Sequence, residues 1–158
     1  MNHCIFANHG CVTDDATLKT IQDYLLESYQ IVHFTGHGNE KNGQGYLILE
    51  TEDLRALEAD NQMVCDLFAD RGIRLVVLSA CKSADLAERL ARKGVPAALA
   101  MQYSVLDESA TQFAYTFYRA PASGHPVDAS LVEARLAMKN APGSNGIDFV
   151  LSILYKLD

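Results

Sequence analysis

Short apolar runs alternate along this chain with segments in which apolar residues recur at helical spacing. The most apolar run is 73–79, whose β-branched residues predict a central parallel strand buried on both faces. Further strands are expected at 5–7, 31–35, 46–50, 95–101 and 149–154. Strands that alternate with helices predict an α/β fold, in which a mostly parallel central sheet is flanked by helices.

The intervening segments predict helices at 13–28, 60–70, 83–93, 109–119 and 127–140. Thr13 is expected to cap the first of them, with Asp14 and Asp15 at the positive end of its dipole. Gly72 and Gly94 are placed to end the second and third helices. No repeat or long linker interrupts the pattern, which predicts a single domain over residues 1–158.

Composition and charge narrow the range of functions. A chain of 158 residues that is 49% hydrophobic can bury a core without disulfides or a structural metal. Thirteen basic residues against 20 acidic ones give a net charge of −7, which does not attract nucleic acid or an anionic membrane surface. The sequence shows neither a long apolar segment nor a secretion leader, so we expect a cytoplasmic protein.

Metal and cofactor sites are not expected. The four cysteines are Cys4, Cys11, Cys65 and Cys81. They lack CxxC spacing, and the nearby His3 and His9 do not complete a known zinc arrangement, so we expect reduced thiols. His33 precedes His37 by four residues, but strand and turn directions separate the two rings, so His33 is expected to be a buried structural histidine.

Two of the expected strands end in residues that can do chemistry. The strand at 31–35 runs into Gly36-His37-Gly38, and the strand at 73–79 runs into Ala80-Cys81-Lys82. Because reactive groups gather at the carboxyl ends of parallel strands, we expect His37 and Cys81 to lie close together. A thiolate is the nucleophile of cysteine hydrolases, and a neighbouring imidazole can raise its population and later protonate the leaving amine.

The glycines around His37 suit the same chemistry. Gly36 and Gly38 permit a sharp turn and a close approach of substrate, and the amides of Gly38 and Cys81 could bind an oxyanion. The 44-residue separation of His37 and Cys81 is close to the roughly 50 residues found in caspases. An inert core thiol and a polar turn histidine are equally compatible with this spacing alone.

An ordered set of motifs favours the catalytic interpretation of His37 and Cys81 over the two structural alternatives. His-Gly, SAC, GVP, FxxxFY and EAR occur in this order, within stretches that include IVHFTGHG and LVVLSACKSADLAERLARKGVPAALAMQY. Over about residues 13–140 the chain resembles the CHAT family of caspase-like proteins, which are relatives of caspases and separase. The resemblance implies a three-layer sandwich of the caspase-hemoglobinase type and a cysteine endopeptidase with a dyad of His37 and Cys81. Gly38 matches the oxyanion-hole glycine of the family.

The resemblance also implies a context and leaves one alternative. Such proteins commonly act in bacterial signalling, defence or cell death, and a partner or a fused sensor domain activates them. Related domains usually carry another strand and helix before the segment at 5–7, so we expect a smaller sheet, or a partner or N-terminal segment that completes its edge. The alternative hypothesis is a catalytically silent CHAT-type module that docks a partner protein.

The loop after the strand at 95–101 is expected to bind the protein or peptide substrate. Caspase relatives build part of the pocket for the P1 residue from this loop, so Asp107 could select a basic P1 side chain. Asp107 is equally well placed to cap the helix that begins near residue 109. Gln102 and Tyr103 are expected to line a groove in which a substrate strand adds to the sheet edge.

Overall fold

Nine strands and five helices make up the part of the chain that the computed structural model describes, residues 3–7, 11–103, 107–140 and 150–157. The strands are β1 (His3–Ala7), β2 (Cys11–Asp15), β3 (Ile31–Thr35), β4 (Gly38–Lys41), β5 (Gln44–Glu50), β6 (Ala56–Ala59), β7 (Leu75–Ser79), β8 (Ala97–Met101) and β9 (Ser152–Lys156). The helices are α1 (Leu18–Tyr24), α2 (Asn61–Phe68), α3 (Ala84–Arg92), α4 (Asp107–Ala122) and α5 (Val127–Lys139).

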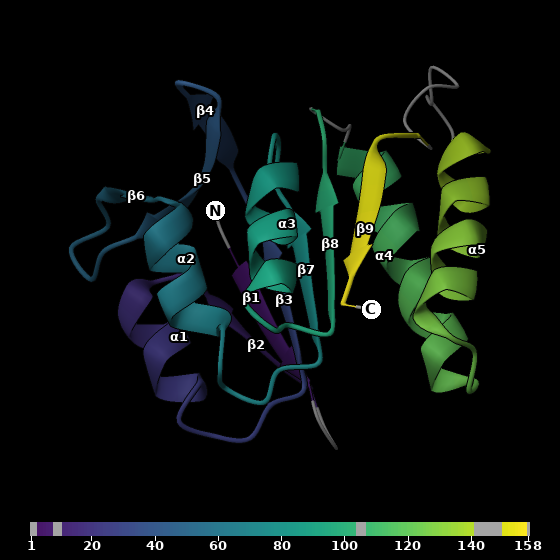
Figure 1. Cartoon of the computed structure of the whole chain (residues 1–158), viewed down its shortest axis with the longest axis horizontal. Helices are drawn as coiled ribbons and strands as arrows, with labels where there is room; N and C mark the ends of the chain where they lie inside the picture. Colours follow the sequence, from purple (N-terminus) through teal and green to yellow (C-terminus); the bar gives the residue numbers. More distant parts are fainter. Residues whose placement is uncertain (1–2, 8–10, 104–106, 141–149, 158) are drawn as a thin grey trace.

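Six of the strands form the central sheet, in the order β2-β1-β3-β7-β8-β9 (Figure 1). The pairs β3–β7 and β7–β8 are parallel, whereas β1 and β9 run antiparallel to their neighbours. Four of the six strands, β2, β3, β7 and β8, therefore point the same way. The other three strands, β4, β5 and β6, form a separate antiparallel sheet.

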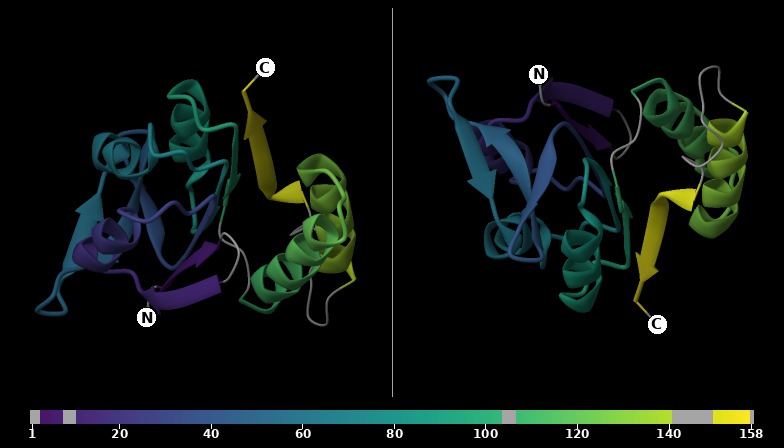
Figure 2. Two further views of the ribbon diagram at one scale, coloured as in Figure 1. Left: turned by 90° about the horizontal axis from the view of Figure 1, so that it is seen from below. Right: turned by 90° about the horizontal axis from the view of Figure 1, so that it is seen from above.

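Helices cover both faces of the central sheet (Figures 1 and 2). Val76 and Leu78 of β7 pack into the core shared with α1, α2 and α3. Leu75 and Val77 point to the opposite face and pack against α4 and α5. A strand buried on both sides needs apolar residues at successive positions, which explains the four consecutive apolar residues at 75–78. The expected α/β sandwich, with a central sheet between two helical layers, is confirmed.

The expected helix at 13–28 is wrong in its first part. Residues 11–15 form strand β2, which pairs with β1 and satisfies the backbone of the segment that carries Asp14 and Asp15. The helix α1 begins only at Leu18, and Thr17 caps it by accepting a hydrogen bond from the amide of Thr20 at 3.0 Å. A threonine in extended conformation is a good cap at either position, so the pairing of β1 with β2 decides the boundary.

The extended segment at 46–50 belongs to a hairpin outside the central sheet. β4 and β5 pair with Lys41 opposite Gln44, which leaves Asn42 and Gly43 as a two-residue loop. Both loop residues have positive φ, 55° and 75°, as this kind of hairpin turn requires. The expected extended segment at 46–50 is confirmed as part of β5.

The last strand differs from the expectation in position. β9 begins at Ser152 and runs antiparallel to β8, whereas the apolar pattern predicted a strand at 149–154, whose first residue lies outside the described part. Arg135 of α5 donates hydrogen bonds to the hydroxyl and carbonyl oxygens of Ser152 and so attaches β9 to the helical layer. Within the described residues, no helix combines the length and the apolar character that crossing a membrane requires.

Candidate functional site at the carboxyl ends of β3 and β7

The two strands that carry the candidate chemistry are direct neighbours. β3 and β7 are parallel, with Thr35 opposite Ser79 at their carboxyl ends. The amide of Gly36 donates to the carbonyl oxygen of Ser79 at 3.2 Å, which extends the contact one residue beyond β3. His37 and Cys81 each follow this last pair by two residues. The chain segments that carry them therefore leave the same edge of the sheet side by side.

Gly38 brings the two segments into backbone contact. A β-carbon at this position would overlap the carbonyl oxygen of Cys81 and would lie 3.1 Å from the Ala80 β-carbon. It would also lie 3.3 Å from the carbonyl oxygen of Tyr46. Backbone atoms cannot yield as a flexible side chain can, so the close approach requires glycine. The glycine expected to contribute an oxyanion amide lies directly against the residue expected to be the nucleophile.

The candidate dyad is accessible to solvent. Cys81 is half-buried and forms no disulfide, and His37 is exposed. The carbonyl oxygen of His37 accepts a hydrogen bond from the amide of Ile48 at 2.9 Å, which holds its backbone to β5. Lys82 follows Cys81 with a φ of 54°, an uncommon value for a residue other than glycine. Partial exposure and a fixed backbone suit a nucleophile that must meet substrate.

Ser83 anchors the turn that carries Cys81. Its side chain is fully buried, and its hydroxyl lies 2.8 Å from the carbonyl oxygen of Ala80 and 3.2 Å from that of Leu78. The amide of Met101 donates to the same hydroxyl at 3.3 Å, and the Ser83 amide donates to the Met101 carbonyl at 3.0 Å. The hydroxyl therefore joins the ends of β7 and β8 instead of capping α3, the helix that it precedes.

Replacing Ser83 with alanine is expected to lower the free energy of unfolding by about 1–3 kcal/mol, because the buried Met101 amide loses a partner. Urea denaturation of the wild type and the variant measures the difference. Ser123→Ala is the matched control: this exposed hydroxyl also bonds a carbonyl, that of Arg119, and its loss should change the free energy of unfolding by less than about 0.5 kcal/mol. Equal effects for the two variants would contradict the anchoring role.

His33 is a buried structural histidine, as expected. Only 3% of its surface is exposed, and its Nε2 lies 2.8 Å from the hydroxyl of Ser79 and 3.2 Å from that of Thr35. Its ring packs against Tyr118 of α4, with the ring centroids 5.5 Å apart. Desolvation by burial lowers the pKa of His33 to about 4, so the ring is neutral near pH 7.

This burial predicts a stability that depends on pH. The unfolded chain protonates His33 near pH 6.5 and the folded protein only near pH 4, so the unfolded state binds more protons between these values. The contribution of neutral His33 to the free energy of unfolding is present above pH 6.5 and is lost as the pH falls towards 4. Between pH 7 and 4.5 the wild type should lose about 2 kcal/mol more unfolding free energy than His33→Gln.

Urea denaturation at the two pH values measures this loss. His125→Gln is the control, because His125 is exposed, and it should lose as much stability as the wild type. An identical pH dependence of His33→Gln and the wild type would contradict the assignment.

The expected substrate-binding residues follow β8, the other neighbour of β7. Gln102 and Tyr103 are exposed at the same end of the sheet as Cys81, and the amide of Gln102 donates to the carbonyl oxygen of Leu151 at 2.8 Å. Asp107 is the first residue of α4, which therefore begins two residues earlier than expected. The side chain of Asp107 lies outside the described part. P1 recognition and helix capping by Asp107 therefore both stay predictions.

Two residues near the site were not recognised from the sequence. Asp85 lies in the first turn of α3, and its carboxylate oxygens accept the amide of Gly45 at 3.1 and 3.0 Å. Gly45 is buried in β5, where a β-carbon would overlap the carbonyl oxygen of Lys82 and the carboxylate of Asp85. A glycine inside a strand often marks a close approach of another backbone, and this signal could have identified it.

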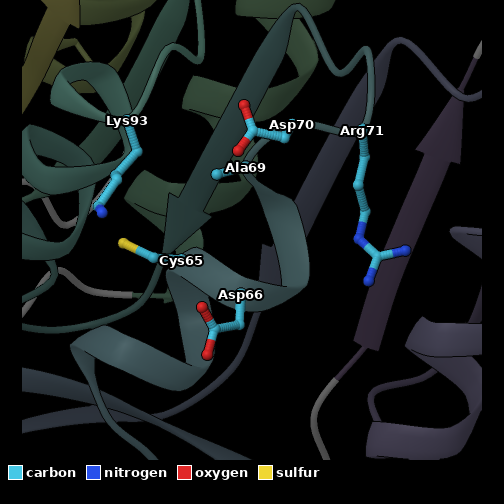
Figure 3. A pocket seen from close by; sticks show the side chains of 6 residues that line it. All are labelled: Cys65, Asp66, Ala69, Asp70, Arg71 and Lys93. Atoms are coloured by element: carbon cyan, nitrogen blue, oxygen red, sulfur yellow. The ribbon is translucent and has the colours of Figure 1, made fainter.

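Neither His37 nor Cys81 lines a hollow of about 410 Å³ in the structure (Figure 3). It is lined by Cys65, Asp66, Ala69, Asp70, Arg71 and Lys93, which lie at the carboxyl ends of α2 and α3. Cys81 precedes the opposite end of α3. Burial raises the pKa of the Cys65 thiol, which disfavours the nucleophilic thiolate. Among the described residues, no group of three or more His, Cys, Asp or Glu side chains could hold a metal ion.

The chain matches a known protein family. A family model described as the CHAT domain matches residues 6–149 and so includes both His37 and Cys81. No curated protein matches the chain.

Proposed function

Because the chain belongs to the CHAT domain family, which is caspase-like, we propose that it is a cysteine endopeptidase with Cys81 as nucleophile and His37 as general base and acid. The observation that carries this proposal is the backbone contact of Gly38 with Cys81 at the ends of two neighbouring parallel strands. The accessibility of both dyad residues supports it as well. No metal or organic cofactor takes part in the proposed chemistry.

The proposed reaction divides into two halves. His37 accepts the thiol proton of Cys81, and the thiolate attacks the carbonyl carbon of the scissile peptide bond. The amides of Gly38 and Cys81 bind the oxyanion that forms. His37 then gives its proton to the leaving amine, and the C–N bond breaks to leave a thioester on Cys81. A water molecule, deprotonated by His37, hydrolyses the thioester and restores the thiol.

The proposed substrates are proteins or peptides that lie along the exposed end of β8. Gln102 and Tyr103 are accessible there, and Asp107 would favour a basic P1 residue if its carboxylate faces the groove. The proposed setting is a bacterial signalling, defence or cell-death pathway in which an activating partner raises the basal activity of the chain. Loops of this kind commonly close only when a partner or substrate binds.

Cleavage of a peptide library tests the proposal. We expect cuts at a defined P1 class, complete inhibition when iodoacetamide alkylates Cys81, and no inhibition by a metal chelator. Cleavage that survives full alkylation of Cys81 would contradict the thiol mechanism. A complete absence of cleavage would contradict the enzyme proposal and favour the silent docking module.

A further inference from the structure

We propose that Asp85 is a positioning residue that holds the β4–β5 hairpin on the turn carrying Cys81 and thereby aligns the amides of Gly38 and Cys81. This inference rests on the proposed peptidase function. It concerns a side chain that takes no part in the proposed bond making and bond breaking.

The carboxylate of Asp85 connects three elements that are distant in sequence. Both of its oxygens accept the amide of Gly45 in β5, which is 40 residues away. Its Oδ2 also accepts the side-chain amide of Asn61 at 3.1 Å. Asn61 begins α2 and is 91% buried, so this hydrogen bond lies largely away from solvent. A single side chain of α3 therefore fixes the start of β5 and the start of α2.

The chemistry of the bridge requires a carboxylate. The groups that face Asp85 are both N–H donors, and a carboxylate offers acceptor sites on both of its oxygens without a donor of its own. An asparagine at this position would turn an NH₂ group towards one of these donors. Gly45 is buried, so water would not fully replace the acceptor that its amide loses.

The hairpin touches the Cys81 turn at two points. Gly38 in β4 lies against the carbonyl oxygen of Cys81, and Gly45 in β5 lies against that of Lys82. The turn contains an uncommon backbone conformation at Lys82, with a φ of 54°, and such a conformation persists only where the surroundings hold it. The bond from the Gly45 amide to Asp85 is a polar attachment that holds the hairpin in this place.

The alignment matters because oxyanion binding is sensitive to geometry. Its donors must lie about 2.7–3.1 Å from the developing charge, and a misplacement of about 1 Å can lower the rate by ~10²-fold. One proposed donor, Gly38, belongs to the hairpin, and the other, Cys81, belongs to the turn. A hairpin released from Asp85 would therefore disturb the pair without changing either catalytic side chain.

The test compares Asp85→Asn with Glu88→Gln in the full chain. Glu88 is a matched control, because it lies in the same helix and its carboxylate forms a half-exposed ion pair with Arg92. We measure amide hydrogen exchange over residues 38–50 and 81–83, kcat and KM on a peptide substrate, and the rate of Cys81 alkylation by iodoacetamide. Alkylation forms no oxyanion, so it reports on the thiol alone. If Asp85→Asn does not fold, Asp85→Glu takes its place in the same measurements, because it keeps the charge but displaces it.

For Asp85→Asn we expect faster exchange in both segments, a kcat lower by ~10²-fold, and KM and alkylation rate within about twofold of the wild type. Glu88→Gln should match the wild type in every readout. Unchanged exchange would overturn the attachment of the hairpin, and faster exchange with unchanged kcat would overturn the positioning role. A wild-type protein without peptidase activity would overturn the proposed function and the positioning role with it, while the exchange measurement would still decide the attachment.

Discussion

Replacing Cys81 with alanine is expected to lower kcat/KM for peptide cleavage by ~10³-fold or more, because the thioester intermediate cannot form. His37→Ala should have a similar effect, because the thiol loses its base and the leaving amine loses its acid. The double variant should be no worse than the single ones, since the two groups act as a unit. Steady-state kinetics on the preferred library peptide measures all three.

Cys65→Ala is the control for the loss of a thiol. Cys65 is buried beside a hollow that contains neither dyad residue, and its raised pKa disfavours the thiolate, so kcat/KM should stay within about twofold of the wild type. The assignment of the nucleophile would be contradicted if Cys81→Ala kept wild-type activity, or if Cys65→Ala lost it.

Gly38→Ala carries the second large expected effect. The added β-carbon would overlap the carbonyl oxygen of Cys81, so either the hairpin or the Cys81 turn must shift. Both proposed oxyanion amides lie at this contact, and we expect kcat to fall by ~10²-fold to 10³-fold. The free energy of unfolding should fall by about 1–3 kcal/mol as the backbone relaxes.

Gly124→Ala separates this effect from the general strain of replacing a glycine. Gly124 has a φ of 83°, so alanine is strained there, but a β-carbon would meet no atom within 4 Å. This variant should lose stability and keep its kcat. A Gly38→Ala protein with wild-type kcat would show that the contact between the hairpin and the turn has no catalytic importance.

The central strands could be predicted because a strand that is buried on both faces has apolar residues at successive positions in the sequence. β7 and β8 lie within the predicted ranges 73–79 and 95–101. Gly94 follows the C-cap of the third helix with a φ of 98°, as predicted, whereas Asp70, with a φ of 58°, and not Gly72 follows the C-cap of the second helix. The positions of His37 and Cys81 at adjacent strand ends followed from the same pattern. The neighbouring backbone positions of the two residues needed only the rule that parallel strands place their carboxyl ends at one edge.

The errors arose where long-range pairing overrides local preference. Asp14 and Asp15 suit the first turn of a helix, yet pairing with β1 makes them part of a strand. The dipeptide Asn42-Gly43 is a strong hairpin signal, and it could have shown that the segment at 46–50 pairs with residues 38–41. The hydrogen bond between Gly45 and Asp85 joins residues 40 positions apart, and the spacing of apolar residues along the chain does not predict such a contact.

The most direct test of the dyad is mass spectrometry after treatment with peptidyl acyloxymethyl ketones that carry basic, acidic or small P1 residues. These compounds alkylate an activated thiol that lies beside a bound peptide. We predict one adduct per chain, located on Cys81, formed by at least one P1 class and strongly slowed in His37→Ala. An adduct on Cys65 in place of Cys81, or equal labelling of Cys81 with and without His37, would contradict it.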